Sequence, residues 1–420
     1  MAEKNLSDRD QAKQKISANI ADVYLASPDF NGMSAYSLPD ALKPLVVELI
    51  AEGDVYANFG HQMVNPHIIG FPQESPAQNA AEVERRGGID SAILYPTRRF
   101  LKEHGAGARY PDEPYTTQLA LGYSQLEPRF FDPAVLGRYR DDPRYDYTFD
   151  IDGRISGTGV AEDTFLATIG VGFDKEPGND EIVIGVPLRY LRDLSPTEQG
   201  YWKSFEHERQ DWVLHPDFVK PHILGEFPDR ISPYEAMLRE MEMVNDLCDA
   251  IEYPHLYRHT YTDTNRPTDF GYVIRPTKRE LSNFVEQLNK MLIDNMDREF
   301  FKGRVDVHEQ RTDTFGNEYM APRGTIAMLK DWLHKVVRHD PDGLVPSAVK
   351  HMRNIRSDRS SVAHDVKENE HDPAVWTTQR ELIVASYVTV RTIRQLLQSH
   401  PRSAIVEVPN VLDEVKVWDF

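Results

Sequence analysis

The first third of the chain mixes short apolar runs with polar stretches, and only its beginning keeps a helical period. From residue 11 to residue 26 apolar positions recur about every 3.6 residues, which predicts one amphipathic helix. Residues 45–69 predict a short helix, a break at Gly53 and a strand over VYANF. The stretch 75–128 is rich in Pro, Gly and charged residues, so we expect loops and short elements there.

The middle of the chain changes to a period of two. In RYDYTFDIDGRISG aromatic and polar positions alternate, and Asp152-Gly153 stands between two runs, which predicts a β-hairpin that turns at this pair. Residues that favour strands fill the next two runs, TFLATIGVGF and EIVIGVPLRYL. Residues 144–192 are therefore expected to form a small antiparallel sheet.

Two helix-start signals follow the predicted sheet. Ser195 precedes Pro196 and has Glu198 three residues later, a pattern of the capping-box type. Ser232-Pro233 opens YEAMLREMEMVNDLCDAI, whose apolar positions form a continuous stripe. Residues 253–272 are rich in Tyr and His and have no period, so we expect a domain boundary after residue 276.

The pattern beyond residue 276 is helical. It predicts four helices with an irregular segment before the second, at residues 277–296, 326–337, 346–355 and 377–397. These helices suggest a compact four-helix bundle within residues 277–400, followed by an apolar tail, 401–420, that packs on the protein or on a partner. The expected fold class is α+β: a mixed α/β region at 1–276, with one or two subdomains, and an all-α domain after it.

Composition narrows the class of protein. The 420 residues fit two or three domains, and an apolar fraction of 40% supports globular cores. No run approaches the ~18 apolar residues of a membrane span, and the first residues lack the apolar centre of a signal peptide. We expect a soluble, cytoplasmic protein with no membrane partner. The single cysteine, Cys248, excludes an intrachain disulfide, and its helical spacing predicts a buried structural thiol.

The negative charge of the chain is unevenly distributed. Residues 277–401 contain 7 Lys and 12 Arg against 18 Asp and Glu, a net charge of +1. Because the whole chain has a net charge of -19, the remaining residues have a net charge of -20. Within the C-terminal region Lys350, Arg353, Arg356 and Arg359 recur every three residues, with His351 beside them. This spacing suggests a basic ridge on one helix, either a phosphate-binding surface or an ordinary solvated face.

The chemistry-bearing motif follows the third predicted helix, in HMRNIRSDRSSVAHDVKENEHD. Arg359 is followed by four residues and then His364, at the edge of the helical segment. This arrangement resembles the HEPN superfamily, whose nuclease members carry an Arg and a His in this way. The resemblance implies a metal-independent endoribonuclease without a cofactor, a homodimer that pairs two sites, and a role as a toxin or anti-phage effector acting on RNA.

The residue types suit this chemistry. Cleavage of RNA by its own 2′-hydroxyl needs a proton acceptor near neutral pKa, for which His364 is suited, and a cation at the phosphate, for which Arg359 is suited. Lys350, Arg353 and Arg356 are further candidate phosphate ligands, and Asp365 is a candidate to orient His364. On an ideal helix Arg359 and His364 lie about 140° apart, so they converge only if the turn is distorted or across a dimer.

Two other functions stay open. The helical domain could serve as a non-catalytic dimerisation or binding module, or the chain could be a metallohydrolase that uses His207, His215, His255 and His259. No known family resembles residues 1–276. By analogy that region is a sensor or restraint answering a phage-derived or antitoxin regulator, and its acidity suggests that it covers the basic ridge.

Overall fold

The structure of the chain is a computed structural model. It describes residues 8–60, 67–70, 72–175, 181–209, 211–227, 230–262, 265–337, 340, 343–364, 369–413 and 417, with the backbone alone for 359–364 and 413. The chain divides into two compact units: unit 1 comprises Met1–Asp146, Asp152–Lys175 and Val183–Phe227, and unit 2 comprises Tyr147–Ile151, Glu176–Ile182 and Pro228–Phe420.

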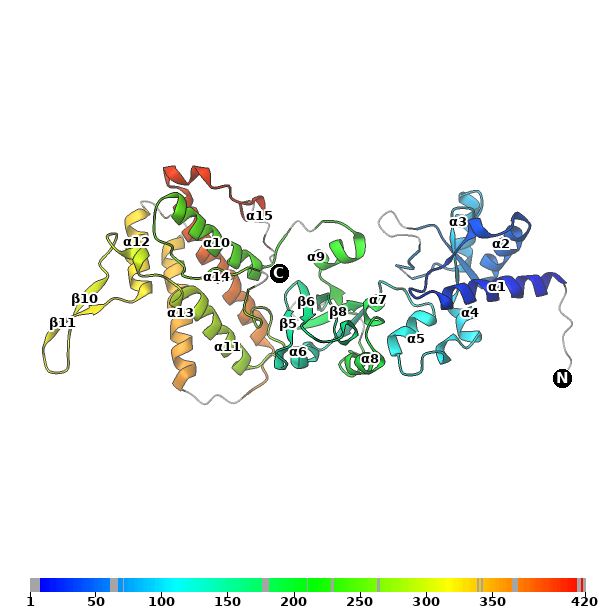
Figure 1. Cartoon of the computed structure of the whole chain (residues 1–420), viewed down its shortest axis with the longest axis horizontal. Helices are drawn as coiled ribbons and strands as arrows, with labels where there is room; N and C mark the ends of the chain where they lie inside the picture. The colour runs from blue at the N-terminus through cyan, green and yellow to red at the C-terminus, as the bar shows by residue number, and fades with distance from the viewer. Residues whose placement is uncertain are drawn as a thin grey trace. The chain divides into compact units, whose positions relative to one another are not determined.

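The first part of unit 1 is a small helix-covered sheet (Figure 1). Strands β1 (Met33–Ser34), β3 (Ile93–Pro96) and β2 (Val55–Asn58) are antiparallel in that order, and helices α1 (Asp8–Ala26), α2 (Lys43–Glu52) and α3 (Pro76–Arg85) pack against them. Its core holds apolar side chains from all these elements, among them Ile20, Val46, Leu49, Val55, Val83 and Leu94. The first predicted helix and the strand over VYANF are confirmed.

A second sheet, most of whose residues belong to unit 1, is antiparallel and has the strand order β4-β8-β7-β6-β5, with β9 pairing with β7. The strands are β4 (Pro128–Phe131), β5 (Tyr145–Thr148), β6 (Asp152–Gly157), β7 (Ile169–Phe173), β8 (Ile182–Pro187) and β9 (Val213–Leu214). The predicted small antiparallel sheet is confirmed, but its turn is misplaced. Asp152 and Gly153 lie within β6 and pair with β7. The chain turns at 149–151 because Phe149 and Ile151 are buried, and this burial outweighs the local turn preference of Asp-Gly.

Short helices complete unit 1. Ser195 caps α8 by accepting a hydrogen bond from the backbone N–H of Glu198, as predicted. The remaining elements are η1 (Ala35–Ser37), η2 (Asp40–Leu42), α4 (Arg98–Glu103), η3 (Ala106–Ala108), α5 (Pro114–Ala120), η4 (Pro133–Leu136), α6 (Gly137–Asp141), η5 (Glu162–Thr164), α7 (Leu188–Leu191), α8 (Pro196–Lys203), α9 (Pro216–Val219) and η6 (Lys220–Leu224).

Unit 2 is mainly helical. Its elements are α10 (Pro233–Ala250), α11 (Lys278–Leu288), η7 (Asn289–Asp294), η8 (Glu299–Phe301), α12 (Thr325–Val336), α13 (Leu344–His364), α14 (Ala374–Gln398), η9 (Pro401–Ile405), α15 (Asn410–Asp413) and the strands β10 (His308–Thr312) and β11 (Glu318–Pro322). Ser232 caps α10, as predicted, and Thr277 caps α11, each through a side-chain oxygen.

The helical unit begins earlier than the boundary expected after residue 276. Helix α10 packs along α14 with an apolar face that includes Met237, Met241 and Val244, all buried. The four-helix bundle expected within residues 277–400 is therefore not confirmed, because α14 also packs along α10, which lies outside that range. Helix α13 is also longer than the predicted 346–355 and runs to His364.

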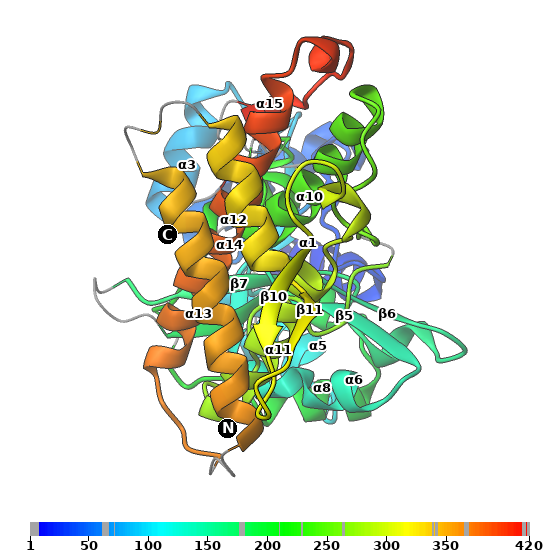
Figure 2. The ribbon, with the colours of Figure 1, turned by 90° about the vertical axis from the view of Figure 1, so that its left-hand side faces the viewer.

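A hairpin that the pattern did not predict joins η8 to α12 (Figure 2). Strands β10 and β11 are antiparallel, with Gln310 opposite Met320, and most of their residues are exposed. Exposure explains the missed prediction, because neither strand has the alternation of apolar and polar residues that burial of one face requires.

The C-terminal tail packs on unit 2 as far as it is described. Leu412 of α15 is fully buried, and Val417 forms a parallel bridge with Ile231. Within the described residues, none of the helices has the length and apolar character needed to cross a bilayer.

Candidate functional site

Helix α13 carries most of the predicted site, and its sequence fixes which face is buried. Apolar residues at helical spacing face the neighbouring helices α11, α12 and α14, and all are buried: Val345, Ala348, Val349, Met352 and Ile355. Lys350 and Arg353 lie on the other side of the helix and are exposed. A continuous apolar stripe therefore holds α13 in place while its cationic residues reach solvent.

A groove between α12 and α13, which lie side by side in Figure 2, is lined by cations. Its volume is about 260 Å³, and it is lined by Lys330, His334, Pro346, Val349, Lys350, Arg353 and Asn354, which we call the cationic groove. Its lining within the described residues contains no carboxylate. Lys330, Lys350 and Arg353 form no ion pair with other described residues. Three cations without a neutralising acid favour an anionic ligand such as phosphate.

The sequence did not point to the contribution of α12. Lys330 and His334 stand four residues apart, so they occupy one face of a helix, and this spacing was the available signal. It is weak by itself, because basic residues on an exposed helix face are common. Only the packing of α12 against α13 brings them to Lys350 and Arg353.

Arg356 and His351 depart from the expected basic ridge. The guanidinium of Arg356 donates to the carboxylate of Asp294 at 2.8 Å, and Asp294 also accepts from the Asn289 amide. Nε2 of His351 lies 2.9 Å from the Ser386 hydroxyl on α14, and burial lowers the pKa of His351 to about 4. His351 is therefore an uncharged packing residue at neutral pH, and Lys350 and Arg353 are the members of the ridge that reach the cationic groove.

Arg359 and His364 both lie on the single continuous helix α13. With 100° and 1.5 Å per residue, position 364 is rotated about 20° from Arg353 and lies about 16 Å further along the axis. Position 364 thus continues the face that carries the cationic groove. Position 359 is rotated about 20° from Met352 and about 140° from position 364. The side chains of these two residues, and Asp365 altogether, lie outside what the structure describes.

The histidines of the metallohydrolase alternative are not gathered. His207 and His215 belong to unit 1, and His255 and His259 belong to unit 2. Nδ1 of His215 accepts from the backbone N–H of Asp217 at a helix start, and Nε2 of His255 lies 2.8 Å from the Asp249 carboxylate. No group of three or more His, Cys, Asp or Glu side chains in the described part of the chain is arranged to hold a metal ion. This arrangement does not favour the metallohydrolase.

Cys248 behaves as predicted. Its side chain is fully buried on α10, and burial raises the pKa of its thiol to about 12. A thiol that stays protonated at neutral pH is a poor nucleophile, so Cys248 is a packing residue.

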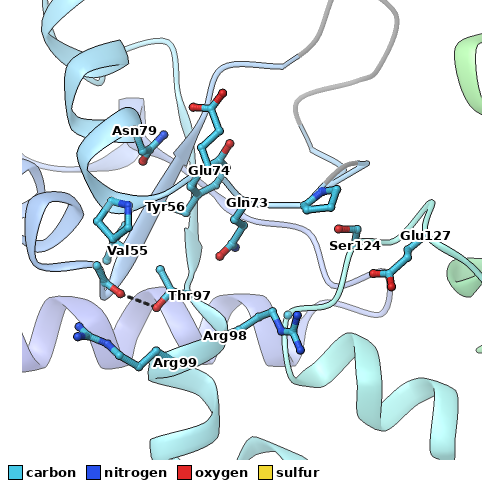
Figure 3. A pocket seen from close by; sticks show the side chains of 14 residues that line it. Val55, Tyr56, Gln73, Glu74, Asn79, Thr97, Arg98, Arg99, Ser124 and Glu127 are labelled. Atoms are coloured by element: carbon cyan, nitrogen blue, oxygen red, sulfur yellow. Dashed lines mark hydrogen bonds between the residues drawn. The ribbon is translucent and has the colours of Figure 1, made fainter. Parts of the chain in front are cut away.

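Unit 1 contains a second hollow, of about 430 Å³, which the sequence did not indicate (Figure 3). The start of β2, residues 72–76, the junction of β3 and α4, and residues 122–127 surround it. Its polar lining comes from segments that are distant in sequence, which is why no local motif marks it. Among the lining side chains are Gln73, Glu74, Arg98, Arg99 and Ser124.

Comparison of the chain with protein-family models, with curated proteins and with solved structures gives no match.

Proposed function

We propose that the chain is a metal-independent endoribonuclease in which the cationic groove binds the RNA backbone and the end of α13 carries the chemistry. The observation that supports this most is the groove itself: Lys330 of α12 and Lys350 and Arg353 of α13 line it without a carboxylate, and α13 also carries the HEPN-like motif. A chain with a net charge of -19 repels RNA at long range, so a local cluster of cations without acids is what RNA binding requires.

The proposed reaction needs no metal or cofactor. His364 takes the proton of the 2′-hydroxyl, the 2′-oxygen forms a bond to phosphorus, and the bond from phosphorus to the 5′-oxygen breaks. The protonated His364 gives this proton to the 5′-oxygen as it leaves, so the products are a 2′,3′-cyclic phosphate and a 5′-hydroxyl end, and His364 is neutral again. Arg359 stabilises the additional negative charge on the phosphate oxygens.

The register of α13 favours a site made by two copies of the chain. Positions 359 and 364 stand about 140° apart on one helix, so one copy presents them in different directions. In a two-fold dimer, His364 of one copy can meet the partner's Arg359, and the second site is equivalent by symmetry.

Mixing two inactive variants tests this composite site. Arg359→Ala and His364→Ala are each expected to be inactive, whereas dimers formed from both together contain one intact site. A random mixture should regain about a quarter of the wild-type activity. A mixture that stays inactive while mixed dimers are shown to form would contradict the composite site but not the ribonuclease itself.

The hairpin β10–β11 favours a second function, a dimerisation module. Its turn is held by hydrogen bonds from the backbone N–H groups of Phe315 and Asn317 to the Asp313 carboxylate, yet the Phe315 side chain is 89% exposed. A rigid turn that presents an aromatic ring to water is typical of a docking element. Residues 306–323 carry four acids and two arginines, so a protein suits this hairpin better than RNA.

A second copy of the chain fits the hairpin. Antiparallel pairing of two β10 strands about Gln310 places Glu309 opposite the partner's Arg311, and each exposed edge gains hydrogen bonds. Sedimentation of wild type and Phe315→Ser at several concentrations tests this function. If Phe315→Ser is monomeric where wild type is dimeric, the docking function is supported; if the two proteins sediment alike, the hairpin is not the dimer contact.

A further inference from the structure

We infer that the hollow of unit 1 is a binding site for a small bipolar ligand, which has an anionic head group, carboxylate or phosphate, and an amino group at its other end. The inference is independent of the proposed ribonuclease, because every residue that carries it belongs to unit 1. The volume of about 430 Å³ lies in the ordinary range of ligand pockets, roughly 300–1,000 Å³.

Two of the charged residues that line the pocket already form ion pairs within the chain. Arg99 donates to the Asp54 carboxylate at 2.5 Å and to the backbone carbonyl of Glu52 at 2.8 Å, and its side chain points to the edge of the pocket in Figure 3. Glu127 accepts from Arg129 at 2.9 Å. Each of these charges already has a partner of opposite sign, so neither is available for a ligand.

Arg98 is the cation that remains. Its guanidinium carbon lies 3.7 Å from the centre of the Tyr123 ring, and it forms no ion pair with any residue among those the structure describes. The ring holds the guanidinium by a cation–π contact, and this contact leaves the N–H groups at its edge free to donate. Arg98 is therefore held in position for an anion.

Ser124 lies beside Arg98 and adds a second donor. The side chains of both residues converge on the right-hand side of the pocket in Figure 3. Ser124 is 4% exposed and lines the pocket, yet its hydroxyl makes no hydrogen bond within the described part of the chain. The hydroxyl is therefore free to donate a hydrogen bond to a ligand oxygen. The Gln73 side chain, held by a 3.4 Å hydrogen bond to the carbonyl of Pro96, also lines this region.

The opposite wall has the other sign. The carboxylate of Glu74 lies there beside Tyr56, and no described residue forms an ion pair with it. Burial raises the pKa of Tyr56, and the nearby Glu74 carboxylate raises it further, so the phenol stays protonated and adds no charge of its own to this wall. One unpaired cation and one unpaired carboxylate across the same pocket suit a ligand with an anion at one end and an amine at the other.

The position of these groups follows from tightly fixed backbone. Thr97, which precedes Arg98, donates its hydroxyl to the carbonyl of Gly53 at 2.7 Å and caps α4. The Asn79 amide pairs with both the N–H and the C=O of Ala57 at 2.9 Å. These bonds hold the walls of the pocket in place without a ligand, so binding would require little ordering.

Titration of the full chain with L-glutamate, AMP and adenosine by calorimetry tests the site. Glutamate and AMP both have an anion and an amine, with a carboxylate or a phosphate as the head group, whereas adenosine lacks the anion. At least one of the two anionic probes is expected to bind, and adenosine much more weakly; which of the two binds identifies the head group. Arg98→Ala should weaken binding roughly 10- to 100-fold, as loss of a charge-assisted hydrogen bond does.

The controls separate binding from folding. Ser124→Ala should weaken binding several-fold without lowering the thermal stability, because the hydroxyl it removes makes no hydrogen bond with the described part of the chain. Lys102→Ala removes an exposed cation of the same helix that does not line the pocket, and it should bind as wild type does. The inference is overturned if neither glutamate nor AMP binds at about 10 mM. It is also overturned if adenosine binds as tightly as AMP, or if Arg98→Ala binds as wild type does.

Discussion

Arg394 of α14 and Glu240 of α10 form a bidentate ion pair whose two side chains are fully buried. The Arg394 Nε donates to Glu240 at 2.8 Å, its Nη2 donates at 3.1 Å, and its Nη1 donates to the Gln398 side chain. Every charged atom of the pair thus has a partner away from water. The pair joins a helix from before residue 276 to a helix from after it.

Removing one partner of this pair should strongly destabilise unit 2. Glu240→Ala leaves the Arg394 cation buried and uncompensated, which typically costs about 3–5 kcal/mol of unfolding free energy. The double variant Glu240→Leu/Arg394→Met should recover most of the loss, since no buried charge remains. Urea unfolding followed by circular dichroism measures both.

A surface pair provides the comparison for these variants. Arg402 pairs with Glu252 while both side chains stay largely exposed, so Arg402→Ala should unfold close to wild type. If Glu240→Ala and Arg402→Ala lose the same free energy of unfolding, the buried pair contributes no more to stability than the surface pair.

The ion pair between Glu240 and Arg394 also predicts which C-terminal fragment of the chain can fold. A fragment of residues 277–420 lacks α10 and leaves Arg394 without Glu240, so we expect it to aggregate or to unfold without cooperativity. A fragment of residues 228–420 keeps α10 and should unfold cooperatively. It should be less stable than the full chain, because Arg266 loses the nearly buried Asp150, 3.1 Å away. Equal cooperative unfolding of both fragments would contradict the position of the boundary.

His351 should make the stability of unit 2 depend on pH. Burial holds its folded pKa at about 4, below the ordinary value of about 6.5, so between these values the unfolded chain binds more protons than the folded chain. The contribution of neutral His351 to the free energy of unfolding is then fully present above pH ~6.5. It is lost as the pH falls towards 4, by up to about 3 kcal/mol. Urea midpoints between pH 7 and pH 5 should fall less steeply for His351→Gln than for wild type.

An exposed histidine, His255, provides the control for the pH measurement. His255 pairs with Asp249 at the surface, with about half of its side chain exposed, so His255→Gln should keep the wild-type slope. If His351→Gln and wild type lose stability in parallel, the burial of His351 is not the cause.

The cationic groove should determine how RNA affinity depends on salt. Each cation that contacts a phosphate of single-stranded RNA adds about 0.7 to the slope of log K against log salt concentration. Lys350→Ala/Arg353→Ala should therefore weaken binding of an RNA oligonucleotide and reduce the slope by about 1.4. Lys302→Ala removes a lysine that is paired with Glu299 and should leave both unchanged. An unchanged slope in the double variant would remove the groove from the RNA-binding surface.

The sequence predicted the elements whose signals are local. Ser195 and Ser232 each cap the helix that they were predicted to start, because the signal of an N-cap lies within four consecutive residues. The antiparallel sheet after residue 144 was predicted for the same reason, since its strands have a clear period and stand next to one another in the chain.

The failures concern contacts between distant residues. The boundary after residue 276 was placed at a stretch without a period, but the Glu240 carboxylate that α14 requires lies before it. The ridge at Lys350 to Arg359 looked uniform in sequence, yet Asp294 engages Arg356 and Ser386 engages His351. The pocket of Arg98 and Ser124 joins four segments, and no sequence period marks such a site.

The most direct test of the central claim is cleavage of RNA by the purified full chain in EDTA, comparing wild type with His364→Ala and with His255→Ala as the control. Wild type and His255→Ala are expected to cut RNA and leave 2′,3′-cyclic phosphate ends, while folded His364→Ala is expected to be slower by about 10²–10⁴-fold. If all three proteins cut alike, or if none cuts while all are folded and bind RNA, the ribonuclease proposal is wrong and the dimerisation module becomes the better account.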